Sequence, residues 1–292
     1  MTLVQLQHFL CLARTRSFVR AAEQLFITQP ALSRSIKALE DELGQLLFDR
    51  LGRRIELTLF GQEVLRRSRL LLEDADELRQ CGRWGSAEAT GRLRVGLSSG
   101  PGLMLTAPLL AHCARHFPHF HIDVSRANTE TLTRQLRERQ VDALIVDVRS
   151  LQPASDLQVE QLLEMPTGFL CRADHPLARL KKVSFAQLSA YPVASTPLSD
   201  EVARILVERY GQQAHPHSMV TLSSDELSHL IEVAEHSDAV VLAIRAAGPR
   251  LVELNLSPAL QVPARFGLVT VARRAQPPFL EVLRQLMGQR LV

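Results

Sequence analysis

A short serine- and glycine-rich turn near the middle of the chain has the residue types of a catalytic nucleophile. Residues 95–102 are VGLSSGPG, and Gly96 to Gly100 fit the G-x-S-x-G pattern, in which a tight turn exposes a serine. The same small residues between a strand and a helix also suit an anionic ligand, because the free N–H groups of the first helical turn can donate hydrogen bonds. Ser98 is therefore either a nucleophile or a binding residue, and the surrounding elements must decide.

The composition excludes several classes of protein. With 292 residues the chain is too long for one small core and predicts two or three domains. A hydrophobic share of 46% indicates a globular protein, and a net charge of +3 permits a nucleic-acid partner. No stretch approaches the roughly 18 apolar residues of a membrane span, and no signal peptide is evident, so we expect a cytoplasmic protein without a membrane partner. The four cysteines form no C-x-x-C pair and are expected to be reduced.

Three helices are expected before residue 45, followed by a short β-ribbon near Leu51 to Thr58. Ser17 and Thr28 are suited to begin the second and third helices, because their hydroxyls can accept hydrogen bonds from the first helical turn. Gly44 is suited to end the third helix in a left-handed conformation. These local patterns predict an all-α start to the chain.

The third predicted helix has one apolar face and one polar face. The apolar residues recur at helical spacing, and they are Leu32, Ile36, Leu39 and Leu43. The opposite face presents Gln29, Ser33, Arg34 and Lys37. These side chains can bond to base edges and phosphates, so the face suits the major groove of a DNA duplex. A polar face that meets only solvent is the alternative at this point.

A long helix without proline is expected from Leu59 to about residue 87. Val64, Leu71 and Leu78 recur every seven residues, which is typical of a coiled-coil seam. The pattern predicts that two chains pair along this helix. The alternative is a single helix that packs on its own domain.

After residue 90 short β-like runs alternate with helices, which predicts α/β domains with mainly parallel sheets. The first of these strands ends at Leu97, directly before the serines of the turn. Ser223-Ser224-Asp225-Glu226 has the pattern of a capping box for the helix that follows.

The N-terminal sixty residues closely resemble the signature of LysR-type transcriptional regulators. The matching residues are Ser17-Phe18, Ala21-Ala22, Leu25, Thr28-Gln29-Pro30-Ala31-Leu32-Ser33, Ile36, Leu39-Glu40, Leu47-Phe48-Asp49-Arg50, Leu57-Thr58 and Gly61. The resemblance implies a winged helix-turn-helix in residues 1–58 and a linker helix in 59–88 that dimerises the protein. It implies a two-subdomain effector domain in 91–292, like a periplasmic binding protein, with subdomain one in 91–161 and 267–292 and subdomain two in 162–266.

The resemblance also implies which residues contact DNA. The expected contacts are Thr28 and Thr58 to phosphates, Gln29, Pro30 and Ser33 to base edges, Arg34 to bases or backbone, and Arg53 and Arg54 of the wing to the flanking minor groove. Few positive charges in this domain imply that several copies act together, as a homodimer or homotetramer on double-stranded DNA.

In the same resemblance the VGLSSGPG turn faces a cleft between the two subdomains. Ser98, Ser99 and Gly100 open one helix there, and the residues from Thr196 to Ser199 open a facing one. Thr129 and Val148, at the ends of the next two strands, complete the expected site. Two positive helix ends that converge on one space predict a small anionic effector, most simply a carboxylate.

Other functions are less consistent with the sequence. A hydrolase needs sheet strands before its nucleophile and a positioned Asp and His, whereas the chain before Leu93 is helical apart from the short ribbon, so we expect no enzyme and no cofactor. His112 and His116 lie one helical turn apart, but the H-E-x-x-H pattern is absent and we expect no metal. The alternative of an architectural DNA-binding protein that binds no effector is not excluded by the sequence. One departure from the family pattern lies at residues 235–238, where EHSD replaces a glycine-rich turn.

Overall fold

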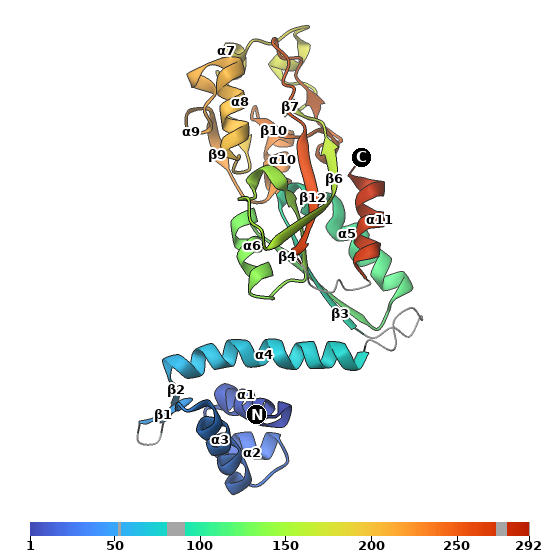
Figure 1. Cartoon of the computed structure of the whole chain (residues 1–292). Coiled ribbons are helices and arrows are strands. Elements are labelled where there is room, and N and C mark those ends of the chain that lie inside the picture. The colour runs from blue at the N-terminus through green and yellow to red at the C-terminus, as the bar shows by residue number, and fades with distance from the viewer. Residues whose placement is uncertain (52–53, 81–90, 273–278, 292) are drawn as a thin grey trace. The chain divides into compact units, whose positions relative to one another are not determined.

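The computed structural model describes residues 1–51, 54–80, 91–272 and 279–291 (Figure 1). The chain divides into two compact units, Met1–Trp84 and Gly85–Val292, and each is described by itself. Among the described residues, no helix has the length and apolar character needed to cross a membrane.

In its described residues the N-terminal unit has four helices and one antiparallel pair of strands. Its elements are α1 (Leu3–Thr15), α2 (Phe18–Gln24), α3 (Gln29–Leu43), β1 (Phe48–Leu51), β2 (Arg54–Leu57) and α4 (Leu59–Gln80). The predicted caps are confirmed: Ser17 accepts a hydrogen bond from the Arg20 N–H, Thr28 accepts one from the Ala31 N–H, and Gly44 ends α3 at φ 72°. The all-α start and its short ribbon therefore follow from local sequence.

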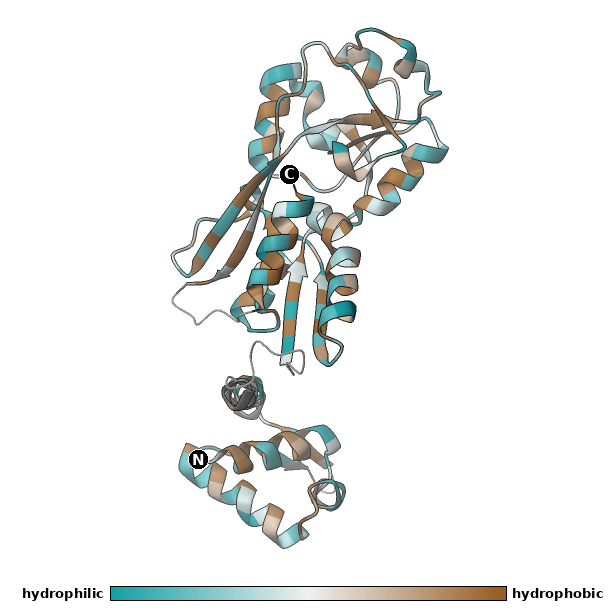
Figure 2. Cartoon of the chain, turned by 90° about the vertical axis from the view of Figure 1, so that its right-hand side faces the viewer, coloured by the Kyte–Doolittle hydropathy of each residue, from teal (hydrophilic) through white to brown (hydrophobic). Residues whose placement is uncertain are grey.

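The predicted apolar stripe of α3 lies in the core of this unit. Leu32, Ile36 and Leu39 are buried, and Leu43 packs against the same core. Phe9 of α1 meets Phe48 edge-on, with ring centroids 5.4 Å apart. Helices with one apolar face produce the alternation of brown and teal along the helices in Figure 2.

Two signature residues of the resemblance have clear structural roles. The Glu40 carboxylate accepts hydrogen bonds from the N–H groups of Leu47 and Phe48, at 2.8 and 3.4 Å, and so ties α3 to the start of β1. A Cβ at Gly61 would lie 2.1 Å from the Leu47 carbonyl oxygen, so only glycine fits where α4 passes this strand.

The C-terminal unit contains two five-stranded sheets. Its strands are β3 (Gly91–Leu97), β4 (Phe120–Arg126), β5 (Ala143–Asp147), β6 (Leu157–Met165), β7 (Thr167–Cys171), β8 (Val193–Ser195), β9 (Val220–Ser223), β10 (Val240–Ile244), β11 (Val252–Glu253) and β12 (Ala264–Val271). Its α-helices are α5 (Ser99–His116), α6 (Thr129–Arg137), α7 (Phe185–Leu188), α8 (Asp200–Tyr210), α9 (Pro216–Met219), α10 (Leu227–His236) and α11 (Leu280–Arg290). Short 3₁₀ helices are η2 (Val148–Ser150), η3 (Pro176–Arg179), η4 (Gln212–Ala214) and η5 (Arg245–Ala247).

Sheet one has the strand order β4-β3-β5-β12-β6, and sheet two has the order β11-β7-β10-β8-β9. The expectation of mainly parallel sheets is wrong. β12 runs antiparallel to β5 and β6, and β7 runs antiparallel to β10 and β11. The reason is connectivity: the chain passes from β6 in sheet one to β7 in sheet two and returns through β12. The expected subdomain boundaries at residues 161 and 267 fall within β6 and β12.

Helices cover both sides of sheet one. α5 and α11 pack together on one side, and α6 lies on the other (Figure 1). Leu132 and Leu136 of α6 are buried against Val146 of β5 and Val269 of β12. This packing fixes the ends of β3, β4 and β5, where the candidate site residues lie.

The turn at residues 235–238 needs no glycine. Helix α10 ends at His236, and Ser237 follows in an extended conformation, with φ −146° and ψ −179°. The Ser237 hydroxyl donates to the Val233 carbonyl at 2.6 Å and accepts from the Ala239 N–H at 3.1 Å. A serine side chain therefore satisfies the helix end that a left-handed glycine would otherwise close.

Candidate functional site

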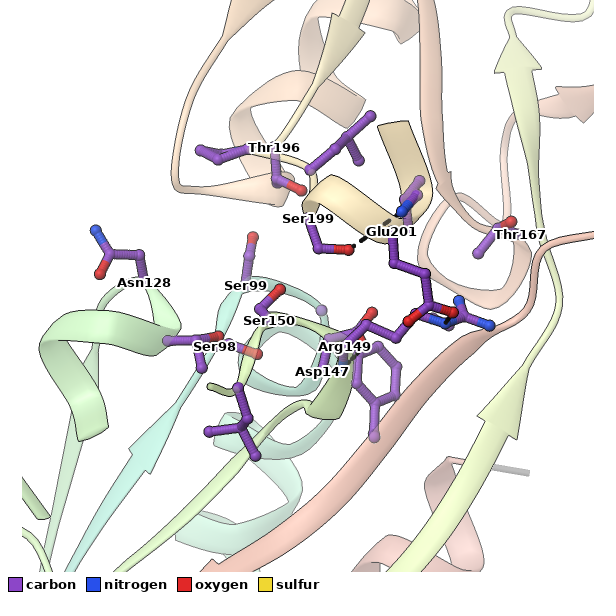
Figure 3. Close-up of a pocket in the computed structure, with 18 of the residues that line it drawn as sticks. Ser98, Ser99, Asn128, Asp147, Arg149, Ser150, Thr167, Thr196, Ser199 and Glu201 are labelled. Atoms are coloured by element: carbon purple, nitrogen blue, oxygen red, sulfur yellow. Dashed lines mark hydrogen bonds and ion pairs between the residues drawn. The ribbon is translucent and has the colours of Figure 1, made fainter. Parts of the chain in front are cut away.

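A cavity of about 650 Å³ lies between the two sheets of the C-terminal unit (Figure 3). Of the residues expected at the site, the structure brings six to its wall, which are Ser98, Ser99, Gly100, Thr129, Thr196 and Ser199. The volume suits a small organic molecule rather than a peptide.

Ser98 and Gly100 form the part of the wall where β3 turns into α5. The Ser98 N–H donates to the Ile145 carbonyl at 3.1 Å, which fixes the turn to β5. Its side chain is 9% exposed and makes no capping hydrogen bond with α5. A Cβ at Gly100 would lie 2.9 Å from the Phe266 ring, so the backbone approaches closely there. The first turn of α5 contains no acidic residue, and its N–H groups face the cavity end of the helix.

Ser99 makes a contact that the sequence did not indicate. Its hydroxyl oxygen accepts a hydrogen bond from the Leu227 N–H at 2.9 Å, at the start of α10. The expected capping box is wrong, because Glu226 at the N-cap makes no side-chain cap bond and its N–H donates to Ser224 Oγ at 3.1 Å. α10 is thus capped by a serine that follows a strand of the other sheet.

The facing wall comes from the segment between β8 and α8. Ser199 caps α8 by accepting from the Val202 N–H at 3.4 Å. The Thr196 carbonyl accepts from the Ser195 hydroxyl at 2.8 Å, which orients the segment. Figure 3 shows Thr196 and Ser199 on one side of the cavity and Ser98, Ser99 and Ser150 on the other.

One end of the cavity is charged. The Arg149 side chain is 6% exposed, and its Nε lies 3.3 Å from Glu201 Oε1. This ion pair lacks hydrogen-bonding geometry, since the buried Nε–H has no hydrogen-bond partner within the described part of the chain. Arg149 also donates to the Pro263 carbonyl. The pair therefore joins η2 on the sheet-one side to α8 on the sheet-two side across the cavity.

Asp147 lies beside this pair at the end of β5. Its carboxylate accepts from the Arg149 N–H at 3.0 Å. Burial raises the pKa of Asp147, and the N–H and the charge of Arg149 only partly oppose that shift. Among the described residues that line the cavity, Arg149 is accompanied by five acidic residues, which are Glu130, Asp147, Asp200, Glu201 and Asp225.

Val148 is not among the lining residues. Its side chain is turned toward sheet one, where a Cβ at Gly267 would meet it at 2.7 Å. Asp147, the last residue of β5, and Arg149 in η2 line the cavity instead.

Sequence reasoning missed several lining residues. Asn128 and Asp147 follow or end strands and could have been found by the rule that ligands bind at the carboxyl ends of parallel strands. Glu201 and Thr167 carry no such pattern, because only the approach of sheet two brings them to the cavity.

The polar face of α3 is open to solvent. Thr28, Gln29, Pro30, Arg34 and Lys37 are exposed, and Ser33 is half-buried. The Thr58 hydroxyl donates to the Leu46 carbonyl and accepts from the Gly61 N–H, each at 2.8 Å. Arg53 lies outside the described residues, and so does the side chain of Arg54.

The expected dimerisation residues differ in their surroundings. Val64 packs against the core of the N-terminal unit, and the intervening Ser68 is buried. Leu71 is 45% exposed. Leu78 lies on α4, but its side chain is outside the described part of the chain. Of the seam residues whose side chains are described, Leu71 is therefore open to a second chain.

The two histidines of α5 lie close together. The rings of His112 and His116 lie 4.6 Å apart, and burial together with the charge of His116 lowers the pKa of His112. In the described ranges no group of three or more His, Cys, Asp or Glu residues is arranged to hold a metal ion.

Comparisons with known proteins agree with the two-unit organisation. Residues 3–62 match the model of the bacterial regulatory helix-turn-helix protein, lysR family, and residues 86–292 match the LysR substrate binding domain. The chain is 34% identical over 292 residues to the SDS degradation transcriptional activation protein of Pseudomonas sp. (strain ATCC 19151), covering 97% of this chain and 94% of that protein. It is 29% identical over 190 residues to the hydrogen peroxide-inducible genes activator of Dickeya chrysanthemi, covering 65% and 61%.

Solved structures show the same fold. Full-length OxyR from Pseudomonas aeruginosa is similar with a TM-score of 0.64 and 25% identity, covering 99% of this chain and 95% of that chain. Full-length CbnR in complex with its target DNA is similar with a TM-score of 0.65 and 18% identity, covering 99% of both chains.

Proposed function

The chain belongs to the LysR family of DNA-binding transcriptional regulators, and from that membership we propose which residues bind DNA and which bind the effector. Helix α3 inserts into the major groove of double-stranded DNA, and a small anionic molecule binds in the cavity between the two sheets. The single observation that carries the proposal is the cavity itself, which both sheets line with hydroxyl groups.

The DNA-binding proposal is supported by the two faces of α3, one apolar and buried and the other polar and largely exposed. Leu32, Ile36 and Leu39 hold the helix in the core, so Gln29 and Lys37 stand free to contact a duplex. We assign base edges to Gln29, Pro30 and Ser33, and backbone contacts to Arg34, Lys37 and the wing residues Arg53 and Arg54. Thr28 and Thr58 stay assigned to phosphates, although the Thr58 proton already has an acceptor within the unit. The Thr58 N–H also donates, to the Leu47 carbonyl at 3.1 Å, so the contact at Thr58 requires a new rotamer of its side chain.

For the effector, the support is the direction of the hydroxyl groups. Ser99 Oγ accepts from Leu227, which leaves its own proton to donate into the cavity. Ser98 Oγ makes no bond to its own helix and is a second donor. A carboxylate beside Ser98 and Ser99 would also meet the free N–H groups at the start of α5.

The charges of the cavity restrict the class of effector. Arg149 already has Glu201 nearby, and the acidic residues outnumber it among the described lining residues. A molecule with several negative charges would be repelled by these carboxylates. We therefore limit the proposal to a monoanion whose single acidic group lies at the α5 end.

Thiol-based sensing of peroxide is not favoured for this chain, although two similar proteins are named for peroxide or as OxyR. Cys11, Cys113 and Cys171 are free and buried. Burial raises the pKa of the Cys113 and Cys171 thiols to about 11, so few thiolates form at neutral pH. Cys81 lies outside the described residues.

A thermal-shift screen of small monocarboxylic acids, each paired with its uncharged amide, tests the proposal. A ligand that binds only the folded state at a concentration one hundred times its Kd adds about 2.7 kcal/mol of stability. Stabilisation by an acid and not by its amide is the expected result. The active acid should also change the protected region of DNA in a footprint, and an unchanged footprint would favour an architectural DNA binder.

We further propose that the protein acts as a homodimer or homotetramer paired through α4. The support is the exposed Leu71 on the heptad seam of α4.

The wall residues that we assign to the effector also include Thr129, Thr196 and Ser199. Val148 is not assigned to the effector site, because its side chain packs on sheet one.

A further inference from the structure

Helix α2 ends in a hydrogen-bond pattern that favours glycine. The Phe26 N–H donates to the Glu23 carbonyl at 3.2 Å, and the Ile27 N–H donates to the Ala22 carbonyl at 3.0 Å. These two bonds form a Schellman motif, in which the residue after the C-cap adopts a left-handed conformation. Here that residue is Phe26, with φ 55°. A bulky side chain in this conformation is strained, whereas glycine is not.

Among the described residues of the unit, no core contact compensates for this strain. The Phe26 side chain is 96% exposed, whereas the next residue, Ile27, packs against the core. An exposed phenylalanine also keeps a large apolar surface in water. The chain therefore retains an aromatic residue where neither the backbone nor the core of the unit requires one. Strain of this kind is characteristic of positions with a binding role.

The position of Phe26 indicates what it could contact. It lies two residues before Thr28, the N-cap of α3, and the exposed Gln29 and Pro30 follow directly. The N-terminal residues of a recognition helix are the ones that meet base edges in the major groove. The apolar group of a base edge in that groove is the C5-methyl of thymine, which phenylalanine can bind.

We propose that Phe26 packs against a thymine methyl group at the edge of the DNA site and so adds to sequence preference. The inference rests on the proposed insertion of α3 into the major groove. The two hydrogen bonds hold the Phe26 backbone in its left-handed conformation before DNA arrives, and the side chain leaves water only in the complex. Phe26 is thus a specificity residue that belongs to the turn of the motif rather than to its recognition helix.

The test uses the full-length protein and thymine-to-uracil substitution, which removes only the methyl group. Wild-type protein first selects a binding sequence from a pool of random duplexes, and each thymine of that sequence is then replaced singly by uracil. Binding is measured for the wild type, Phe26→Gly and Phe26→Leu. At one position the wild type should lose about fourfold in affinity, which corresponds to the burial of one methyl group.

The variants separate this contact from a general weakening. Phe26→Gly should bind the thymine duplex more weakly than the wild type, and replacing the critical thymine by uracil should cost it no further affinity. Phe26→Leu should show part of the wild-type loss at that uracil. Phe26→Gly should also raise the midpoint of urea unfolding, because glycine suits the left-handed position. Arg16→Gly is the matched backbone control: Arg16 ends α1 at φ 52°, so it should raise stability without changing the loss at uracil.

Either of two results with uracil would overturn the inference. One is a Phe26→Gly protein that retains the full uracil effect, and the other is a wild type that tolerates uracil at every position. A changed oligomer mass for Phe26→Gly with an unaltered uracil effect would place the side chain at a protein contact instead. A pool without enriched sequences would overturn the DNA-reading role of α3 itself, and this inference with it.

Discussion

Ser99 Oγ accepts a hydrogen bond from the Leu227 N–H at 2.9 Å, although the two residues are 128 positions apart in the chain. The bond joins the start of α5 beside sheet one to the start of α10 beside sheet two. Next to it, Arg126 at the end of β4 and Glu226 at the N-cap of α10 form an ion pair of 2.8 Å. The edge of the cavity is therefore held by one cap and one ion pair that both cross between the subdomains.

Ser99→Ala should weaken the cap of α10. Loss of a serine cap costs about 1 kcal/mol, and here the bond that is lost crosses between subdomains. Hydrogen exchange should become faster at the Leu227 amide and its neighbours. Ser199→Ala removes the cap of α8, a bond within one subdomain, and is the control. It should leave hydrogen exchange at the Leu227 amide unchanged. Unaltered protection at Leu227 in the Ser99 variant would contradict this assignment.

Ser98→Ala and Thr196→Val should weaken effector binding by roughly 1 to 3 kcal/mol, because each removes one hydrogen-bond partner of a bound carboxylate. Neither residue belongs to the N-terminal unit, so DNA binding without effector should be nearly unchanged. Calorimetry with the acid found in the screen measures both effects. Equal affinity in the wild type and both variants would place the effector elsewhere.

Asp147→Asn should stabilise the protein most at neutral pH. Burial raises the pKa of Asp147 in the folded state, so protonation favours folding. The stability from its protonated form is fully present below the ordinary pKa of about 4, and it is lost as the pH rises through the raised value. Urea unfolding at a series of pH values should therefore show the gain of the variant growing with pH.

Asp156→Asn is the control, because the pKa of Asp156 is lowered whereas that of Asp147 is raised. Hydrogen bonding to Arg137 lowers the pKa of Asp156, so its contribution appears as the pH rises through that lowered value and is lost again on acidification. This variant should be neutral or destabilised near pH 7. A gain that does not depend on pH for Asp147→Asn would show that the burial of its charge is not responsible.

Gln29→Ala should cost roughly 1 to 3 kcal/mol on the selected DNA and relax the preference at one base pair. Lys37→Ala should weaken selected and random duplexes alike and reduce the salt slope by about one. Both side chains are exposed on α3, so neither change should disturb folding. If Gln29→Ala lost the same affinity for the selected and the random duplex, Gln29 would contact the DNA backbone rather than a base.

Leu71→Asp should lower the oligomer mass and, with it, the affinity for DNA. Leu71 is 45% exposed on α4, and a charge in a coiled-coil seam disfavours pairing. Leu59→Asp is the matched control, since Leu59 is 86% exposed at the first turn of the same helix. Light scattering at micromolar concentration measures the mass. A monomeric wild type would disprove pairing through α4.

The sequence by itself determined the elements whose causes are local. Thr28 and Gly44 begin and end α3 through contacts within a few residues, and the stripe from Leu32 to Leu39 decides which face is buried. Caps and periodicity act over one or two helical turns, so they can be recognised without a partner. The VGLSSGPG turn was placed correctly at the end of the first strand of the C-terminal unit for the same reason.

Only the tertiary structure decided how the two subdomains meet. The expected capping box of α10 failed because Leu227 is capped by Ser99, and no local pattern encodes a partner 128 residues away. The antiparallel return of β12 and the approach of Glu201 to Arg149 are also long-range contacts. Such contacts depend on the packing of both sheets around one cavity, and that packing is a property of the whole unit rather than of any segment. The sequence predicted an anionic effector from the helix ends alone. The carboxylates around the cavity, which only the structure located, restrict that proposal to a monoanion.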